Sequence, residues 1–490
     1  MTLPVLSHTT DSFPGSAADA AVLVVPSLDG SPASFDGYPG LADALTAVGF
    51  TGSPSSFTRV HAPEVSTVPL AVVGIGNDAS SDAVRNAVGT AVRSLTGFDT
   101  VAIGLAPSLE GFAVAAAEGA VLGGHRFDGY RTKKAPARAT SVVLHADLDD
   151  DAVHRAQTLG EAVALVKDLV NVPAEWQSPD DLARSAAESV ADLDVTVQVL
   201  DENDLAEQGF GGILGVGQGS DRPPRLVRLD YAPADASTHI ALVGKGITFD
   251  TGGLSLKPAA SMVGMKFDMA GAATSLAALR AIATLGLPVR VTAWLCIADN
   301  MPSGRATRPG DVLRMLDGTT VEVVNTDAEG RLVMADGLVA ASRENPDIIL
   351  DVATLTGAIV MALGHRHTGV MGDDETVQRY LDAAASVDEA AWRMPLPDYM
   401  EDTLESPIAD LINANMGDRA GGASFAGLFL RRFVGRVSDA DDAPRIPWVH
   451  LDIAGSGENG GGAHGFTDKG PTGATVRSIV AFAESAVTGA

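Results

Sequence analysis

The chain has one cysteine, few aromatic residues, few basic residues and no long apolar run. Cys296 is the only cysteine among 490 residues, so no disulfide can form within the chain and nothing favours an oxidising compartment. No stretch approaches the roughly 18 uninterrupted apolar residues of a membrane span. The first 15 residues lack the basic and apolar regions of a secretion signal. We therefore expect a cytoplasmic protein without a membrane anchor.

Positive charge is also scarce. The 34 lysines and arginines face 62 aspartates and glutamates, which gives a formal net charge of −28. Such a chain repels phosphate backbones, so we do not expect binding to nucleic acid or to anionic membranes. The stretch 131–138 (RTKKAPAR) is the one basic segment that could oppose this expectation. With 46% hydrophobic residues, the chain can bury substantial cores and is expected to fold.

The first third of the chain predicts a small α/β domain. Short apolar runs alternate there with alanine-rich segments that suit helices. The runs cover residues 21–25, 68–73, 101–105 and 141–145. An acidic stretch then opens a predicted connecting helix over residues 149–172, and Pro173 and Pro179 interrupt the pattern. We therefore predict an N-terminal domain over residues 1–172.

Residues 173–490 predict a second, larger domain in which buried strands alternate with apolar helices. The expected strands are 239–244, 289–297, 321–324, 348–352 and 448–452, and the expected helices are 271–285, 331–343 and 473–485. Continuous apolar strands covered by helices indicate a mixed, mostly parallel sheet. The predicted fold class is α/β with two domains.

Acidic residues lie at the ends of several of these elements. Asp250 follows the first strand of the second domain, and Asp268 precedes its first helix. Asp327 and Glu329 follow the strand at 321–324. Because sites in open α/β sheets gather at the carboxyl ends of strands, we expect these four carboxylates to converge.

Packed carboxylates repel one another unless a cation offsets their charge. Oxygen ligands suit hard or borderline divalent ions such as manganese or zinc. Four carboxylates exceed what one catalytic ion with an open position usually takes. The sequence therefore predicts a site for two divalent metal ions.

Each acidic residue also has a simpler interpretation. The stretch 325–329 could begin a helix with a side-chain cap, Asp268 could cap another helix, and Asp250 could form a turn. Caps do not explain Lys245 and Lys257, which flank the same acids although lysines are few. These lysines could still be ordinary salt-bridge partners.

Other motifs are weaker. The segment 74–79 (GIGNDA) mimics a dinucleotide-binding fingerprint, but a lone pattern of this kind is common. The pair in His365-Arg-His367 has no further ligand nearby and is nonspecific. Cys296 lies within a predicted strand and is expected to be a small core residue.

The motif NTDAEGRL at residues 325–332 resembles the signature of the cytosolic leucyl aminopeptidase family. Segments that resemble the family's other motifs follow in the same order, at residues 243–258, 265–273, 300–304, 351–357 and 450–454. The likeness is dense from about residue 165 onward and thin before it. Asp299 departs from the family pattern, which has glutamate there. The resemblance implies that residues 173–490 form a catalytic metallopeptidase domain.

The resemblance also implies the ligands of two metal ions. Lys245, Asp250, Asp268 and Glu329 would bind the tighter ion. Asp250, Asp327 and Glu329 would bind the more exchangeable ion, so Asp250 and Glu329 would bridge the two. A lysine binds metal only as the neutral amine, so the bound ions would have to depress the pKa of Lys245.

Further roles are implied for the surrounding residues. Lys257 would stay charged and act as an electrophile, and Arg331 would hold a bicarbonate ion that serves as general base. The pocket for the first side chain of the substrate would be lined by Met265, Thr354, Leu355 and Gly357. The implied activity is the release of N-terminal, preferentially leucine-like residues from short peptides by a two-metal hydrolytic mechanism. The implied assembly is a homohexamer with its active sites facing an interior cavity.

Two other functions stay open at this point. Some members of the family also bind DNA as regulators, and the stretch 131–138 is the only candidate patch for that role; the net charge argues against it. The chain could also be a catalytically dead relative. The presence of Asp327, Glu329, Lys257 and Arg331 argues against this second alternative.

Overall fold

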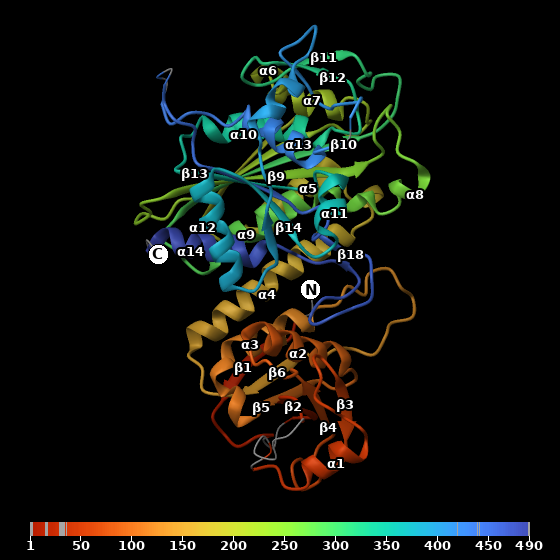
Figure 1. The fold of residues 1–490 in the computed structure, drawn as a ribbon, viewed down its shortest axis with the longest axis vertical. Helices are drawn as coiled ribbons and strands as arrows, with labels where there is room; N and C mark the ends of the chain where they lie inside the picture. Colours follow the sequence, from red (N-terminus) through yellow and green to blue (C-terminus); the bar gives the residue numbers. More distant parts are fainter. Residues whose placement is uncertain are drawn as a thin grey trace. The chain divides into compact units, whose positions relative to one another are not determined.

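The computed structural model describes residues 3–14, 18–28, 35, 37–418, 420–438, 440 and 442–488. Its contacts divide the chain into two compact units (Figure 1). The N-terminal unit comprises Met1–Ala164 and Asn459–Gly470, and the C-terminal unit comprises Leu165–Glu458 and Pro471–Ala490. The division falls within helix α4 (Asp150–Asn171), which matches the predicted connecting helix. The domain boundary between residues 172 and 173 stays a prediction.

The N-terminal unit is built around a six-stranded sheet with the order β1-β6-β5-β2-β4-β3. The strands are β1 (Val5–Thr9), β2 (Ala20–Val25), β3 (Phe57–Val60), β4 (Leu70–Gly74), β5 (Thr100–Leu105) and β6 (Ser141–His145). The helices are α1 (Leu41–Ala47), α2 (Ser81–Ser94), η2 (Pro107–Phe112) and α3 (Ala113–Gly124). Strand β3 is antiparallel to its neighbour, and the other pairs are parallel. The four short apolar runs of the sequence overlap strands β2, β4, β5 and β6.

The C-terminal unit contains an eight-stranded sheet with the order β15-β14-β17-β13-β9-β10-β8-β7. These strands are β7 (Val195–Leu200), β8 (Arg225–Tyr231), β9 (His239–Asp250), β10 (Arg290–Asn300), β13 (Ile348–Ala353), β14 (Thr368–Gly372), β15 (Ala391–Arg393) and β17 (Trp448–Asp452). One smaller sheet contains β11 (Asp311–Arg314), β12 (Thr320–Val323) and β16 (Leu411–Ile412). Another contains β18 (Glu458–Asn459) and β19 (Gly470–Pro471).

Helices cover both faces of the eight-stranded sheet. The helices of this unit are η3 (Ala174–Trp176), α5 (Pro179–Ser189), α6 (Glu202–Gln208), α7 (Gly211–Gly217), α8 (Ala259–Met262), η4 (Met265–Met269), α9 (Ala270–Thr284), α10 (Gly330–Ser342), α11 (Gly357–Leu363), α12 (Asp374–Ser386), η5 (Asp398–Leu404), α13 (Gly422–Arg431) and α14 (Val476–Thr488). Figure 1 shows α9 and α14 on one face and α10 and α13 on the other. The four central strands β17, β13, β9 and β10 pair in parallel, and antiparallel pairs lie outside them. The predicted α/β class with a mixed, mostly parallel sheet is confirmed.

Strand β9 is longer than the sequence pattern predicts. It was expected to end at Gly244, but it continues to Asp250 and pairs with β10 from His239 to Ile247 and again at Asp250. Both faces of this extension are covered, so even the polar Lys245 and Thr248 are buried. The prediction that the strand ends at Gly244, before Lys245 and Asp250, was therefore wrong; both are strand residues.

Glycine at the start of α9 brings this helix close to the sheet. A Cβ atom at Gly271 would lie 2.1 Å from the carbonyl oxygen of Val352 in β13 and 3.0 Å from the backbone nitrogen of Lys245 in β9. Only glycine permits this approach. The turn η4, which carries Asp268 just before α9, is thereby held against strand β9. Among the described residues, no helix is long and apolar enough to cross a membrane.

Candidate metal centre

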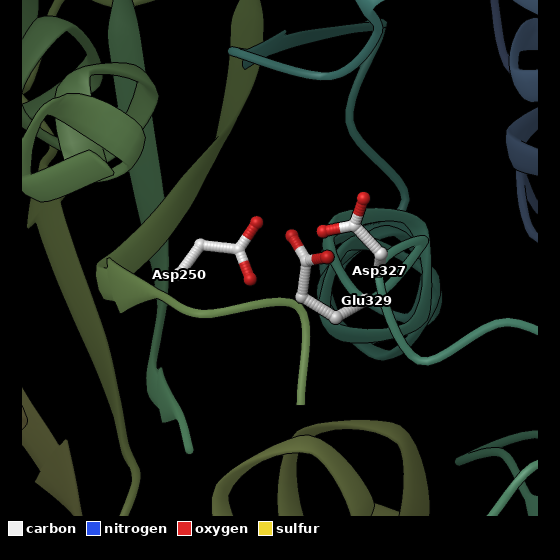
Figure 2. A group of neighbouring side chains, drawn as sticks. All are labelled: Asp250, Asp327 and Glu329. Atoms are coloured by element: carbon white, nitrogen blue, oxygen red, sulfur yellow. The ribbon is translucent and has the colours of Figure 1, made fainter. Parts of the chain in front are cut away.

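Three carboxylates of the C-terminal unit meet in space (Figure 2). Asp250 ends strand β9, while Asp327 and Glu329 lie in the turn between β12 and α10. One oxygen from each lies within 4.8 Å of the other two. Two oxygen atoms bound on opposite sides of one divalent ion are separated by a comparable distance, because each metal–oxygen bond is about 2.0–2.6 Å long. This is the single group of three potential ligands found in the described part of the chain.

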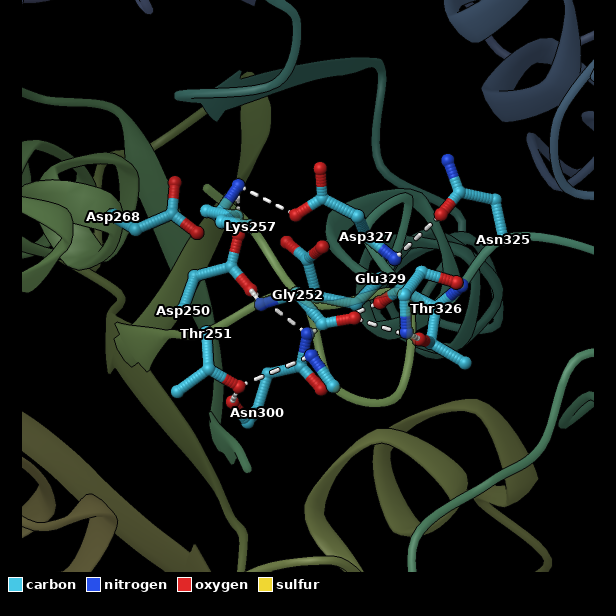
Figure 3. A network of polar contacts seen from close by, with 12 residues as sticks. Asp250, Thr251, Gly252, Lys257, Asp268, Asn300, Asn325, Thr326, Asp327 and Glu329 are labelled. Carbon is cyan, nitrogen blue, oxygen red and sulfur yellow. Dashed lines mark hydrogen bonds and ion pairs between the residues drawn. The ribbon is translucent and has the colours of Figure 1, made fainter. Parts of the chain in front are cut away.

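Two lysines lie between the carboxylates, and Figure 3 shows one of them, Lys257, beside Asp250 and Asp327. Lys245 Nζ is 2.9 Å from Glu329 Oε1 and 2.8 Å from Asp268 Oδ2. Lys257 Nζ is 2.8 Å from Asp250 Oδ2 and 2.6 Å from Asp327 Oδ1. Every predicted ligand thus belongs to one cluster, and Asp268 joins it through Lys245.

Glycine in α10 leaves space for the buried Lys245 side chain. A Cβ atom at Gly330 would lie 2.5 Å from Lys245 Cε, so a larger residue there would displace the lysine. The far end of Lys245 donates a hydrogen bond to the carbonyl oxygen of Thr354 at 3.0 Å. The Thr354 hydroxyl in turn donates to Asp268 Oδ1 at 2.7 Å. Thr354, the residue that follows strand β13, therefore fixes the positions of both Lys245 and Asp268.

The electrostatics of the cluster are dominated by burial and by close opposite charges. Burial opposes the charge of Lys245, but Asp268, Glu329 and Asp250 outweigh it and raise the pKa of the amine. Burial likewise opposes the charge of Lys257, and Asp250 and Glu329 reverse the effect, so its pKa is also raised. The carboxylates respond unequally. Burial raises the pKa of Asp268, whereas the two lysines outweigh burial and lower the pKa of Glu329.

The donor set suits divalent metal ions. Four carboxylates outnumber the two ammonium groups, and Asp250, Asp268 and Glu329 are almost completely buried. A buried excess of negative charge is costly unless cations offset it. Oxygen ligands with one neutral amine are chemically acceptable to ions of the manganese or zinc type. The residues present therefore fit a metal centre, and Lys245 fits as a ligand only after losing its proton.

Helix capping does not account for these acids. Helix α10 begins after Glu329, and its first turn has no side-chain cap. Helix α9 follows Met269 and also lacks one, so Asp268 is not a cap. The turn interpretation holds in part, because Asp250 Oδ1 accepts a hydrogen bond from the Gly252 backbone at 2.8 Å. The other oxygen of Asp250 still faces Lys257.

Asn300 is a positioning residue that the sequence did not identify. It ends strand β10, and its Nδ2 donates to Asp250 Oδ1 at 2.8 Å and to the Thr326 carbonyl at 3.1 Å. One amide therefore ties β9 to the turn that carries Asp327 and Glu329. The residue opens the motif at 300–304, but that motif alone gives it no role.

Asn413, just after β16, holds the same turn from the other side. Its Oδ1 accepts from the backbone of Val324 at 2.9 Å, and its Nδ2 donates to the carbonyls of Asn325 at 2.7 Å and Ala328 at 3.2 Å. No signal in the sequence could have found it, because it lies more than 80 residues from the turn and in no recognisable motif.

Arg331 lies in the first turn of α10. Its Nη1 donates to the Asn413 carbonyl at 2.7 Å, and its guanidinium carbon lies 5.4 Å from the ring centre of Phe425. The Nε atom is buried without a hydrogen-bond partner. Burial lowers the pKa of Arg331 to about 10, although Glu329 and Asp452 oppose the shift. A buried, unsatisfied donor of this kind suits an anion.

The residues predicted to line the substrate pocket lie around the end of β13 and in η4. Met265 begins η4, Gly357 begins α11, and Thr354 contacts both Lys245 and Asp268. The Leu355 backbone donates to the buried carboxylate of Asp452 at 3.1 Å, which fixes the path of this segment. Their role in substrate selection stays a prediction.

Other sequence motifs lie outside the cluster. The segment His365-Arg-His367 is exposed between α11 and β14. Cys296 is fully buried in β10, as expected of a core residue. Two residues of the basic stretch 131–138 make contacts within the N-terminal unit. Arg138 forms an ion pair with Asp468 at 2.8 Å, and Lys134 donates hydrogen bonds to backbone carbonyls.

Comparisons with known proteins agree with the residue pattern. A model of the catalytic domain of the cytosol aminopeptidase family matches residues 164–480, and a model of that family's N-terminal domain matches residues 29–134. The probable cytosol aminopeptidase of Clavibacter michiganensis is 52% identical over 496 residues, covering 99% of each chain.

Solved structures give the same result. The bottromycin maturation enzyme BotP in complex with Mn is 37% identical, with a TM-score of 0.86 over 96% of this chain and 100% of BotP. A mutant of tomato leucine aminopeptidase is 28% identical, with a TM-score of 0.85 over 98% of this chain and 96% of its own. The catalytic-domain model alone spans more than half of the sequence, and the relative from Clavibacter covers nearly all of it. This chain therefore belongs to the cytosol aminopeptidase family.

Proposed function

We propose that this protein releases leucine-like residues from the N-termini of short peptides by a hydrolytic mechanism that uses two metal ions. Aminopeptidase activity follows from the family, which is metal-dependent. The observation that carries the finer proposal is the cluster of Asp250, Asp327 and Glu329, with Asp268 and two lysines in contact with it.

Two overlapping ligand sets would hold the ions. Lys245, Asp250, Asp268 and Glu329 form one set, and Asp250, Asp327 and Glu329 form the other. The second set coincides with the three carboxylates whose oxygens approach within 4.8 Å, which supports this division. When bound, the ions would supply Lewis-acid activation of the scissile carbonyl and of a water molecule.

The protein's own residues would complete the chemistry. Lys257 lies at the Asp250 and Asp327 side of the cluster with a raised pKa, so it carries a positive charge that can stabilise negative charge developing on the carbonyl oxygen. Arg331 would hold a bicarbonate ion as general base, a role supported by its buried, unsatisfied Nε. Thr354 would orient Lys245 and Asp268 through its two hydrogen bonds.

The substrate class is part of this proposal, and the resemblance of the chain to the family supports it. The free α-amine of the substrate would bind one of the metal ions, and Met265, Thr354, Leu355 and Gly357 would line the pocket for the first side chain. The ions would be manganese or zinc; the solved BotP complex contains Mn. A cytoplasmic homohexamer with enclosed sites would restrict substrates to short peptides.

Metal analysis and a panel of substrates test the proposal together. Purified protein should contain divalent metal, and added Mn or Zn should support hydrolysis of a panel of aminoacyl anilides with leucine among the best. Asp327→Ala should abolish most of this activity, because it removes one of the three carboxylates that would hold the second ion. Unchanged hydrolysis of leucine anilide by Asp327→Ala would contradict the metal model. Mass photometry of the same sample tests the hexamer.

A further inference from the structure

A cavity in the C-terminal unit is bordered by arginines, although basic residues are scarce in this chain. Its volume is about 580 Å³, and it is lined by Asp373, Glu401, Arg431, Arg432, Pro444 and Arg445. Arg431 ends helix α13, Arg432 follows it, and Arg445 lies shortly before strand β17. The exposed Arg436 pairs with Arg445 through an isolated β-bridge. These four arginines, here called the arginine cluster, all come from residues 431–445.

One carboxylate serves two members of the arginine cluster. Glu401 Oε2 lies 2.9 Å from Arg432 Nε, and Glu401 Oε1 accepts a hydrogen bond from Arg431. Asp398 is 3.5 Å from Arg431, but its side chain is 95% exposed, so water screens this pair. Asp373 Oδ2 accepts a hydrogen bond from the first backbone nitrogen of strand β17 at 2.8 Å. Glu401 therefore carries most of the compensation for two positive charges.

The other two arginines have no carboxylate partner among the described residues. Arg445 Nη1 donates to the carbonyls of Arg431 at 2.5 Å and Val434 at 3.1 Å. Arg436 Nη1 donates to the carbonyl of Ala443. A guanidinium has five N–H groups, so these backbone contacts leave most donors of both side chains available. Burial first, and then the positive charges of its three arginine neighbours, lower the pKa of Arg445.

This arrangement suits a small anion with two negative charges. Helix capping explains why Arg445 meets the carbonyls at the end of α13, but it does not explain four guanidinium groups around one cavity. A phosphate group carries about 1.5 to 2 negative charges at pH 7 and has more acceptor oxygens than a carboxylate. Planar guanidinium forks bind its oxygens in pairs. The cavity is larger than one phosphate ion, so an attached organic group also fits.

We propose that the arginine cluster binds a phosphate group, either as the free ion or as part of a small phosphate ester. Arg436 and Arg445 supply the available N–H groups, and the other two arginines add positive charge around them. The lining of the cavity shares no residue with the carboxylate cluster of the metal centre. The inference does not rest on the proposed peptidase function, so the two can fail separately.

Isothermal calorimetry with the metal-loaded, full-length protein tests this site at low salt, where charge interactions are least screened. Inorganic phosphate, ribose 5-phosphate and glutarate are titrated separately. Arg436→Gln and Arg445→Gln each remove one available guanidinium, whereas Glu401→Gln removes the competing carboxylate. Arg305→Gln is the matched control, because Arg305 is an exposed arginine that pairs with Asp221.

We expect both phosphate compounds to bind the unmodified protein and the control equally. Affinity should fall about tenfold in each cluster variant that loses an arginine, the scale of a lost hydrogen bond between charged groups. It should rise in Glu401→Gln, a gain that a folding defect cannot produce. Tighter binding of ribose 5-phosphate would identify an ester as the occupant, and tighter binding of inorganic phosphate would identify the free ion.

Four results would overturn the inference. The first is the absence of heat with both phosphate compounds. The second is affinity that none of the three cluster variants changes. The third is binding lost in Arg331→Met and kept in the cluster variants, because the phosphate would then occupy the anion site at Arg331. The fourth is glutarate bound as tightly as phosphate, because the site would then select carboxylates.

Discussion

Lys245 and Asp268 form a buried ion pair, with Lys245 Nζ 2.8 Å from Asp268 Oδ2. In this arrangement the pKa of Lys245 is raised, so the amine carries a proton that a metal ion must displace. Burial also raises the pKa of Asp250 to about 6 and of Asp268 to about 8, and both must lose protons to bind metal well. Metal affinity should therefore rise as the pH rises through about 6 to 8.

Isothermal calorimetry checks this expectation. Titrating Mn into metal-free protein in two buffers with different ionisation enthalpies should give different heats, because protons are released. Lys245→Met removes the displaced proton and should release fewer. Identical heats in the two buffers, or an affinity that does not change with pH, would show that the site is already deprotonated.

Replacing Lys257 should separate catalysis from metal binding. The side chain contacts Asp250 and Asp327 through its ammonium group and is not assigned as a ligand. For Lys257→Ala we expect kcat to fall by about 10²–10³-fold, the scale of one lost transition-state donor. Metal content, measured by plasma emission spectrometry, should stay near that of the unmodified protein. Lys133→Ala, at an exposed lysine, is the control. Loss of both metals together with activity would assign Lys257 to the ligand sphere.

Asn300 should control how tightly the metal is held. Its amide joins Asp250 to the turn of Asp327 and Glu329, so its removal frees one ligand to move. We expect Asn300→Ala to weaken metal affinity by about 10–100-fold, as other supporting residues of metal sites do. Chelator competition measures the affinity, with Asn77→Ala as an exposed control. An unchanged metal affinity would mean that β9 and the turn are fixed by other contacts.

The central strands could be predicted because they are buried on both faces and read as continuous apolar runs. Strand β17 was found at its true bounds, and β13 within one residue at its end. The extension of β9 could not be predicted, because Lys245, Gly246 and Thr248 resemble loop residues. Only pairing with β10, where Lys245 lies opposite Cys296, makes this segment a strand.

The candidate site was predictable to the extent that local motifs carry it. The stretch at 325–329 and the segment around Asp250 have dense, specific patterns, and the structure brings their carboxylates together. The supporting amides of Asn300 and Asn413 act over long separations in the sequence. Nothing in a single sequence distinguishes such an asparagine from one on the surface, because its partners are brought near only by the fold.

Arg331 provides the last prediction. Its guanidinium is fixed by the Asn413 carbonyl and by Phe425, while its Nε has no protein acceptor. If bicarbonate binds there as general base, activity in carbonate-free buffer should increase when bicarbonate is added. Arg331→Met should lower kcat by about 10²–10⁴-fold, the usual contribution of a general base, and should remove the response to bicarbonate.

The exposed Arg343 at the other end of α10 gives a matched control, Arg343→Met, which should respond to bicarbonate like the unmodified protein. Thermal unfolding of both variants separates a fold defect from a catalytic one, because Arg331 is buried. A variant at Arg331 that folds, binds metal and still responds to bicarbonate would place the anion elsewhere. The general base would then have to come from a side chain of the cluster, of which Asp327 is the most exposed carboxylate.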